Sequence, residues 1–509
     1  MGPQEHVSLL IDRNLEAGRA DAVALITEEG DEVSFADVHR LVCRFAQRLS
    51  DRGVRREERV LLVMDDTPHF HAAFLGTIRV GAVPVPVNFM SNPDDFGYFL
   101  EDSYAVMTVV DPPFVEAVRP FAERLGVPLV TAGASDGDLD LDAWLAEGPD
   151  EFDPVTTHRD DPAMWQYSSG STGRPKGVVH LQHDAAYTAE HLGEKVLGLT
   201  ADDRVYSTSK LFHTYGLGNA LTFPLWVGAC AVQMTGRPTA ARTLDRVEQH
   251  RPTALFCVPA LYNAMLAEPG FADRELSSVR MAVSAAEPLP AWVWHRWNEQ
   301  TGIEILDGIG STEMLQTYCI NRPGEVRPGS AGRPVDGYEL QLRDPEGTPL
   351  PDDAEETGEL WVAGDSALAY YHHQHEKTKD SIQGRWFRSG DRFRRDADGY
   401  YWYEGRVDDM IKVKGLWVSP IDVENRLIAH DAVSEAAVVG VDRQGFASIV
   451  AYVILNPDHE GGDEMTTTLQ QWCKDGLQRY EFPREIAYVD DLPRTATGKI
   501  QRFKLRQRA

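Results

Sequence analysis

Apolar residues in the first quarter of the chain fall into short continuous runs separated by helical stretches. Residues 60–64 (VLLVM) and 105–110 (AVMTVV) are rich in β-branched and apolar side chains, which is typical of strands buried on both faces of a sheet. A helical pattern covers residues 68–80 and stops at Gly81, and a further short strand is expected at 83–87. This strand–helix–strand alternation predicts an α/β fold with largely parallel sheets.

The last part of the chain reads as a separate unit. Apolar runs at 433–441, 449–455 and 486–489 predict strands, and residues 467–477 between them predict a helix. A unit of roughly a hundred residues has an ordinary domain size. We therefore expect an N-terminal domain and a smaller α+β C-terminal domain, which span residues 1–407 and 408–509.

Composition and charge narrow the class of protein. The chain has 509 residues, of which 42% are hydrophobic and 25% charged, and its formal net charge is −29. Such acidity disfavours binding to nucleic acid and to anionic membranes, so an anionic substrate must be attracted by local positive charge. The N-terminus lacks the features of a signal peptide, and no run of about 18 apolar residues occurs. We expect a cytoplasmic protein without a nucleic-acid or membrane partner.

Residues 167–177, which read YSSGSTGRPKG, form the most informative segment. Glycines allow backbone N–H groups to approach an anion closely, while the hydroxyls, Arg174 and Lys176 add donors and positive charge. Polyphosphate is therefore the expected ligand. The segment is not a Walker A loop, because Pro175 stands where that pattern continues with Gly-Lys-Ser/Thr. The alternative interpretation is a flexible Ser/Gly surface turn.

Other polar segments point to a nucleotide. Residues 307–313 read DGIGSTE, and their oxygen ligands suit Mg²⁺, which normally arrives with nucleotide phosphates. The glycine pairs here and at 216–218 lack the third small residue of a dinucleotide fingerprint, which excludes an NAD enzyme. Residues 386–391 (WFRSGD) end in an Asp that can accept both ribose hydroxyls, although Ser-Gly-Asp is also common in turns. Residues 495–500 (TATGKI) have the composition of a docking loop, with a solvated tail as the alternative.

In this order the segments resemble the adenylate-forming superfamily of acyl-CoA synthetases, peptide-synthetase adenylation domains and luciferases. The resemblance is closest to the benzoate–CoA ligase branch, through residues 210–225 (KLFHTYGLGNALTFPL), 307–315 and 414–420 (KGLWVSP). It implies a large N-terminal domain of α/β subdomains with mostly parallel sheets and a small barrel-like part. A small, mobile α+β C-terminal domain would follow. ATP, Mg²⁺ and CoA would be used, by a monomer or homodimer.

The resemblance also implies a role for each matching residue. The β- and γ-phosphates would be held by Ser168, Ser169, Gly170, Ser171, Thr172, Gly173 and Lys176. Adenine would be framed by Ala285, Ala286, Glu287, Asp307, Gly308 and Ile309. The ribose would be bound by Asp391 and Arg406, the α-phosphate by Thr312 and the Mg²⁺ by Glu313. The aryl pocket would use His213, Tyr215, Gly216, Ala285, Gly310 and Gln316. The hinge would be Asp408, and the lysine that serves adenylation would be Lys499.

The implied reaction joins an aromatic acid to a thiol in two steps. ATP would convert a benzoate-type acid, with or without a hydroxyl or amino substituent, to aryl-AMP, and the acyl group would then pass to the thiol of CoA. Transfer to a carrier-protein thiol or another nucleophile is the alternative, and a non-catalytic nucleotide-binding relative is a third interpretation.

Three positions depart from the family's usual residues. Ala286 stands where relatives commonly have Gly, and His213 where the closest branch tends to carry Phe. Gln316 stands where benzoate-type relatives often have His. Because Gln offers both a donor and an acceptor, it could read a ring hydroxyl or amino group, or it could be a plain pocket wall.

Overall fold

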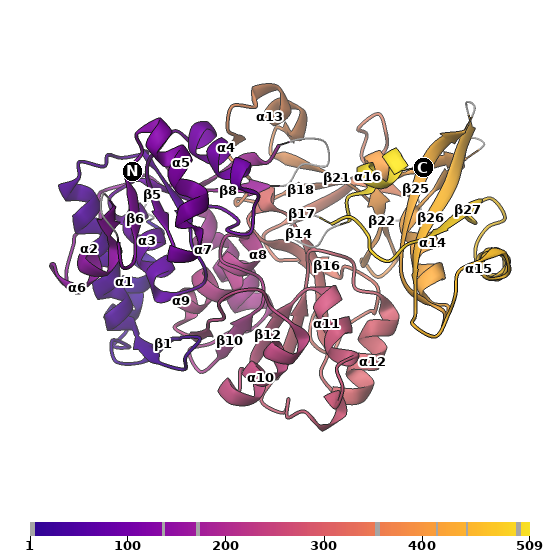
Figure 1. Cartoon of the computed structure of the whole chain (residues 1–509), viewed down its shortest axis with the longest axis horizontal. Coiled ribbons are helices and arrows are strands. Elements are labelled where there is room, and N and C mark those ends of the chain that lie inside the picture. Colours follow the sequence, from indigo (N-terminus) through magenta and orange to yellow (C-terminus); the bar gives the residue numbers. More distant parts are fainter. Residues whose placement is uncertain are drawn as a thin grey trace.

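The computed structural model describes residues 6–134, 138–168, 174–351, 357–413, 416–443, 446–494 and 500–508. Figure 1 shows a large unit that contains most of the chain and, beside it, a smaller unit formed by the C-terminal residues. The large unit holds two mainly parallel sheets with helices around them, and an antiparallel sheet lies toward the smaller unit. The predicted α/β class is therefore confirmed.

The first parallel sheet has the strand order β4-β3-β5-β6-β7. Its strands are β3 (Arg59–Val63), β4 (Val83–Pro86), β5 (Ala105–Val110), β6 (Leu129–Thr131) and β7 (Leu139–Asp140). Helices pack on both of its faces: α2 (Phe35–Asp51), α3 (Pro68–Arg79), α4 (Pro93–Ser103) and α5 (Val115–Leu125). Val60 and Leu62 join the core under α2 and α3, whereas Leu61 and Val63 join the core under α4 and α5. Because both faces of β3 are covered, its sequence is an unbroken apolar run.

The second sheet has nine strands in the order β16-β15-β14-β13-β12-β10-β11-β1-β2. Its central ladders are parallel, and antiparallel strands close both edges. The strands are β1 (Val23–Ile26), β2 (Glu32–Ser34), β10 (Arg204–Ser207), β11 (Cys230–Val232), β12 (Ala254–Cys257), β13 (Met281–Ser284), β14 (Ile305–Gly310), β15 (Thr317–Ile320) and β16 (Arg333–Pro334). The helices that follow its strands include α10 (Ala240–His250), α11 (Pro259–Leu266) and α12 (Ala291–Thr301).

Antiparallel strands complete the large unit. A hairpin of β8 (Pro162–Ser168) and β9 (Lys176–Leu181) pairs with β19 (Tyr370–Tyr371). A separate five-stranded sheet corresponds to the expected barrel-like part, and it contains β17 (Glu339–Arg343), β18 (Gly358–Ala363), β20 (Ile382–Gln383), β21 (Trp386–Arg395) and β22 (Tyr401–Arg406).

Short helices connect these layers. They are α1 (Leu9–Glu16), η1 (Pro112–Phe114), α6 (Leu141–Ala146), α7 (Asp184–Thr188), η2 (Ala189–Val196), α8 (Thr214–Leu217), η3 (Gly218–Thr222), α9 (Phe223–Val227), η4 (Phe271–Asp273), η5 (Thr312–Met314), α13 (His375–Ser381) and η6 (Val407–Asp409). No helix in the described part of the chain is both long and apolar enough to cross a bilayer.

The C-terminal unit has the expected α+β composition. Its sheet has the order β25 (Val433–Arg443), β26 (Phe446–Leu455) and β27 (Glu485–Tyr488), with the hairpin β23 (Ile411–Val413) and β24 (Leu416–Val418) nearby. Its helices are α14 (Pro420–Ile428), α15 (Asp463–Gly476) and α16 (Arg502–Arg508). The predicted helix at 467–477 begins four residues too late, because Asp463 and Glu464 form an acidic first turn that favours a helix N-terminus. The boundary predicted at residues 407 and 408 lies in η6 and stays a prediction.

Candidate functional site

The candidate phosphate loop lies at the turn of the β8–β9 hairpin. Ser168 pairs with Lys176 in the last residue pair of the ladder before the turn. The loop residues between them, Ser169, Gly170, Ser171, Thr172 and Gly173, lie outside the described residues. The amine of Lys176 lies 5.3 Å from the centroid of the Tyr371 ring. Burial lowers the pKa of Lys176, and the nearby Glu313 carboxylate opposes this shift.

Glu313 lies in η5, immediately after the end of β14, and β19 holds it in place. The Tyr371 hydroxyl donates to Glu313 Oε1 at 2.8 Å, and the Leu368 N–H donates to the Glu313 carbonyl at 2.7 Å. Burial, with a smaller contribution from the Glu313 charge, raises the pKa of Tyr371, so the phenol stays protonated and remains a donor. Sequence reasoning missed Tyr371, because no local pattern links it to a residue 58 positions earlier.

The environment of Glu313 fits a metal ion that arrives with nucleotide phosphates. Among the residues that the structure describes, no three His, Cys, Asp or Glu side chains come together as a metal site. Mg²⁺ is usually held by one or two carboxylates together with substrate phosphates, so a single carboxylate beside a phosphate loop suits it. Glu313 is therefore a suitable ligand for this ion.

The two candidate ribose residues face each other across the β21–β22 ladder. Asp391 pairs with Arg406, whose Nη1 donates to Asp391 Oδ1 at 3.0 Å and to the Ser389 carbonyl at 3.3 Å. The Asp391 charge raises the pKa of Arg406, and Glu313 contributes in the same direction. Arg406 also contributes to the lowered pKa of Lys176. The charges of Lys176 on β9, Glu313 in η5, Asp391 on β21 and Arg406 on β22 therefore act on one another in one region.

The candidate adenine residues lie at the carboxyl ends of two neighbouring parallel strands. Ser284 of β13 is in register with Asp307 of β14, which brings residues 285–287 close to residues 307–309. This edge of a parallel sheet is where ligands generally bind in α/β folds. Asp307 is buried, and its Oδ2 accepts from the Leu289 N–H at 3.2 Å, whereas its Oδ1 has no partner within hydrogen-bond geometry.

The Asp307 Oδ1 atom lacks a partner of good hydrogen-bond geometry, with only the Ser284 hydroxyl and the Gly308 N–H beside the carboxyl, so it suits a ligand that donates an N–H, as the exocyclic amine of adenine does. Burial raises the pKa of Asp307 to about 7, and the neighbouring Ser284 hydroxyl opposes that rise. A buried polar atom without a partner costs folding free energy, so binding of a ligand whose N–H donates to Asp307 Oδ1 would be favoured.

The structure explains one of the three departures from the family pattern. Ala286 has φ = +81°, in the left-handed region that a side chain disfavours. A glycine at this position would relieve the strain, which accounts for the glycine that is usual there. Such strain is often found at functional sites.

Two of the candidate aryl-pocket residues, Tyr215 and Gly216, lie on α8, which continues into the π-helical segment η3. A Cβ atom on Gly216 would lie 2.2 Å from the Lys210 carbonyl oxygen, and one on Gly218 would lie 2.1 Å from Gln316 Nε2. The two glycines therefore permit close packing here, which explains the Gly-x-Gly spacing without a dinucleotide. The Tyr215 hydroxyl donates to the Val283 carbonyl at 3.2 Å.

Gln316 is buried and bonded to the protein at both ends of its amide. Its Nε2 donates to the carbonyls of Thr214 at 3.4 Å and Tyr215 at 3.2 Å, and its Oε1 accepts from the Thr317 N–H at 2.8 Å. Gly310 pairs with Thr317 in the adjacent ladder. The structure therefore places Gln316 against the wall that carries Tyr215.

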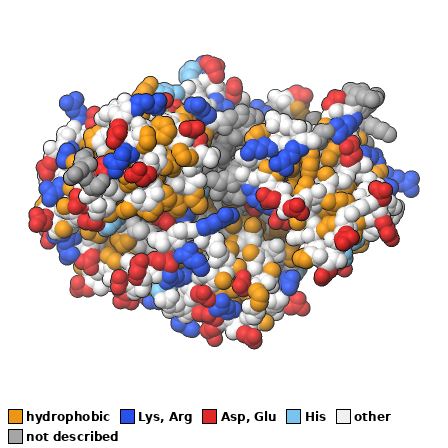
Figure 2. Space-filling view, viewed as in Figure 1, with side chains coloured by type: hydrophobic (Ala, Val, Ile, Leu, Met, Phe, Trp, Pro, Cys, Tyr) orange, Lys and Arg blue, Asp and Glu red, His pale blue; other side chains and the backbone are white. Residues whose placement is uncertain are grey.

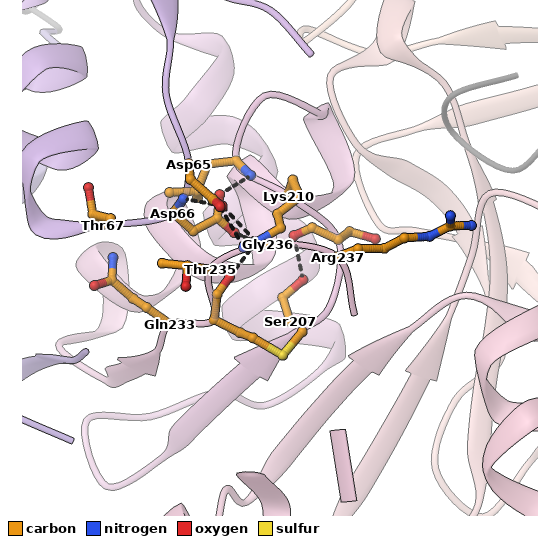
Figure 3. Close-up of polar contacts among 12 residues, drawn as sticks. Asp65, Asp66, Thr67, Ser207, Lys210, Gln233, Thr235, Gly236 and Arg237 are labelled. Atoms are coloured by element: carbon orange, nitrogen blue, oxygen red, sulfur yellow. Dashed lines mark hydrogen bonds and ion pairs between the residues drawn. The ribbon is translucent and has the colours of Figure 1, made fainter. Parts of the chain in front are cut away.

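His213 lies on a loop that a buried ion cluster fixes to the first sheet. Its N–H donates to the Lys210 carbonyl at 2.9 Å. Figure 3 shows the Lys210 amine beside Asp65 and Asp66, at 2.8 Å and 3.8 Å, with Gly236 next to Asp65. Burial raises the pKa of Asp66 to about 6, and Lys210 opposes the rise. Sequence reasoning missed this cluster. The one local feature that could have indicated a buried charge was Lys210 directly before the apolar residues Leu211 and Phe212.

The two C-terminal candidates could not be placed in the same way. Lys499 lies outside the described residues, and the main chain of residue 408 belongs to η6. Figure 2 shows acidic side chains spread over the visible face of both the large and the small unit.

Comparisons with known proteins add independent findings. A family model described as AMP-binding enzyme matches residues 12–372, and one described as AMP-binding enzyme C-terminal domain matches residues 422–499. The chain is 45% identical to a benzoate–CoA ligase from Thauera aromatica, over 98% of this chain and 94% of that protein. It is 40% identical to a 4-hydroxybenzoate–CoA/benzoate–CoA ligase from Rhodopseudomonas palustris, over 98% and 93% of the two chains. A crystal structure of an anthranilate CoA ligase in complex with anthranoyl-AMP superimposes with a TM-score of 0.94 at 38% identity, covering 99% of this chain and 98% of that one.

Proposed function

The chain belongs to the AMP-binding enzyme family, and we propose that it is an AMP-forming ligase that joins an aromatic carboxylic acid to CoA. It uses ATP and Mg²⁺ for activation and CoA as the acceptor. The observation that carries the proposal is the meeting of distant segments at Tyr371, whose hydroxyl donates to Glu313 at 2.8 Å and whose ring centroid lies 5.3 Å from the Lys176 amine, with the charge of Arg406 acting on the same groups. This cluster has the charges needed for a carboxylate, a triphosphate and a cation to meet.

The first step activates the acid. A carboxylate oxygen of the acid attacks the α-phosphorus of ATP. A bond forms between that oxygen and the α-phosphorus, and the bond from the α-phosphorus to pyrophosphate breaks. Because two anions must meet, positive groups are required, and Lys176, Arg406 and Lys499 are the residues we assign to this role. Bound Mg²⁺ would neutralise phosphate charge, with Glu313 as its protein ligand. Thr312 would contact the α-phosphate.

The second step transfers the acyl group. The sulfur of CoA attacks the acyl carbon, the carbon–sulfur bond forms, the thiol proton is lost and AMP leaves. We assign His213 to the entrance through which the thiol reaches the acyl carbon. A rotation of the C-terminal unit about residue 408 would remove Lys499 between the two steps, since hinges at domain boundaries absorb such changes.

The substrate is a planar ring with small substituents. The relatives described above are named for benzoate, 4-hydroxybenzoate and anthranilate. In this chain Tyr215 and Gly216 would line the ring site, and Gln316 would act on the ring through the backbone it holds. We propose that hydroxy- or aminobenzoates are accepted alongside benzoate, by a monomer or homodimer in the cytoplasm.

A panel of benzoates with hydroxyl or amino groups tests the proposal, with pyrophosphate release measured with and without CoA. We expect acid-dependent pyrophosphate release, and aryl-CoA as a product when CoA is present. If no aromatic acid supports release above the acid-free rate, the proposal is wrong. If aryl-AMP forms but CoA never accepts the acyl group, the acceptor is a carrier-protein thiol or another nucleophile instead.

A further inference from the structure

A buried histidine, His180, contacts the main chain of η5 at Thr312. His180 lies on β9, four residues after Lys176, and Asp184 begins α7. Both side chains are fully buried. The ring Nε2 lies 2.7 Å from the Thr312 carbonyl oxygen, and the ring Nδ1 lies 2.8 Å from Asp184 Oδ2.

The direction of these bonds follows from the chemistry of the partners. A carbonyl oxygen can only accept, so Nε2 carries a proton and donates to Thr312. The Asp184 carboxylate can only accept as well, so Nδ1 also carries a proton and donates to it, and the same carboxylate accepts from the Leu181 N–H at 3.0 Å. With both nitrogens held, the imidazole has a fixed orientation, as in histidines oriented by a carboxylate behind them.

The same carbonyl closes the short turn that carries the catalytic residues. Thr312 O also accepts from the Leu315 N–H at 3.1 Å, so both of its lone pairs are used. A three-residue 3₁₀ turn has few internal hydrogen bonds, and external contacts therefore decide how it is oriented. The Thr312 residue is only half-buried, so its hydroxyl is accessible to a ligand.

We propose that His180, held by Asp184, is a positioning residue that fixes the Thr312 peptide and thereby aims the Thr312 hydroxyl at the α-phosphate. This inference rests on the proposed function. Thr312 touches the group whose bonding changes in both steps, so a loosened turn should slow both. Displacement of a catalytic group by about 1 Å can cost about 10²-fold in rate.

The test uses two substitutions at one position. His180→Leu removes the donor, and we expect the turnover number to fall by about 10- to 100-fold, with the KM for the aromatic acid little changed. The fall should be similar for aryl-AMP formation and for aryl-CoA formation from supplied aryl-AMP. His180→Gln retains a side-chain N–H that can reach the Thr312 carbonyl, and it should recover most of the rate.

His71→Leu is the matched control. His71 is also a buried imidazole that contacts a backbone carbonyl, Thr67 O at 3.2 Å, but it lies in α3 and not against η5. Rates are divided by the number of active sites, titrated as aryl-AMP formed in the absence of CoA. We expect His71→Leu to lower thermal stability while the rate per titrated site stays at the wild-type value.

Three results would overturn the inference: a wild-type rate per site in His180→Leu, equal losses in the Leu and Gln variants, or an equal loss in His71→Leu. Failure of the proposed function would look different, because the wild-type enzyme itself would then form no aryl-AMP.

Discussion

The wall of the aryl pocket and the adenine edge both adjoin the second sheet, yet their polar groups are used differently. On the aryl wall, the Tyr215 hydroxyl and both ends of the Gln316 amide are bonded within the protein. At the adenine edge, Asp307 Oδ1 is buried without a partner and Ala286 holds a strained backbone. We therefore expect the proposed aryl wall to be complete before a substrate binds, and the proposed nucleotide side to gain its partners from ATP and the C-terminal unit.

If the nucleotide side needs positive charge from the C-terminal unit, loss of the lysine at residue 499 should have the largest effect on the rate of aryl-AMP formation. Lys499→Ala should lower aryl-AMP formation by about 10²-fold or more, the scale of losing one positioned electrostatic group. Aryl-CoA formation from supplied aryl-AMP should stay near the wild-type rate. The exposed Lys504→Ala is the control for loss of a C-terminal charge. Equal losses in both half-reactions would contradict a rotating C-terminal unit.

The completeness of the aryl wall can be tested by adding atoms to it. Gly216→Ala places a Cβ against the Lys210 main-chain carbonyl, which cannot move away easily, and should lower the free energy of unfolding by about 1–3 kcal/mol. Gly218→Ala meets only the end of the Gln316 side chain, so the added substitution Gln316→Ala should restore stability. Thermal or urea denaturation measures both. Rescue of Gly216→Ala by Gln316→Ala would contradict the packing described here.

At the adenine edge, removal of the Asp307 carboxyl, whose Oδ1 lacks a partner, should specifically weaken the binding of ATP. Asp307→Ala should raise the KM for ATP about tenfold, the scale of one hydrogen bond to a buried polar group, while the KM for the acid changes little. Steady-state kinetics with each substrate varied in turn gives both constants. A raised KM for the acid with an unchanged KM for ATP would assign Asp307 to the aryl side.

Asp307 also predicts a pH dependence of stability. Its pKa is about 7 in the folded protein against 3.8 for an ordinary Asp side chain, so between these pH values the folded state binds more protons than the unfolded state. The free energy of unfolding contributed by this group therefore falls as pH rises from about 4 to about 7. Asp307→Ala removes this pH-dependent fall. The free energy of unfolding of the variant should therefore rise relative to that of the wild type as pH increases from about 4 to about 7. A constant difference would contradict the raised pKa.

On the aryl wall, Gln316 should act through the backbone it holds. Gln316→Leu loses the bonds to the Thr214 and Tyr215 carbonyls and should lower the preference for hydroxy- or aminobenzoate over benzoate about fivefold, on the order of 1 kcal/mol. Ratios of kcat/KM for the two acids measure this. The KM for ATP should not change. An unchanged ratio would remove Gln316 from substrate selection.

The smallest effect concerns the strained backbone beside adenine. Ala286→Gly should raise the free energy of unfolding by about 0.5–1 kcal/mol, because relief of the left-handed strain outweighs the added chain entropy. The neighbouring Ala285→Gly is the control: Ala285 is absent from the positive-φ residues, so the same exchange should destabilise. A loss of stability in Ala286→Gly would contradict the strain.

Patterns within a few residues were enough to predict much of the fold. The run at residues 60–64 appears as β3 because both faces of that strand are covered, which leaves no polar position to confuse the pattern. The start of α15 was misplaced because Thr466 is a weak helix former, and the acidic turn of Asp463 and Glu464 before it was not recognised. Local motifs likewise predicted Glu313, Asp391 and Arg406 as site residues.

Contacts between distant segments could not be predicted. Tyr371, His180 and Lys210 each act on a residue far away in the sequence, and none belongs to a motif with its own chemical meaning. The left-handed backbone of Ala286 was equally hidden, because a φ angle follows from the surrounding fold and not from the residue type alone.

A single-turnover experiment tests the central claim, which is that this chain activates an aromatic acid as its adenylate before thiol transfer. Enzyme is mixed with radiolabelled benzoate or aminobenzoate, ATP and Mg²⁺, then quenched before and after CoA is added. We expect enzyme-bound aryl-AMP in near-stoichiometric amounts before CoA, and its quantitative conversion to aryl-CoA afterwards. Label that remains in the free acid until CoA is present, with no aryl-AMP at any time, would contradict the claim.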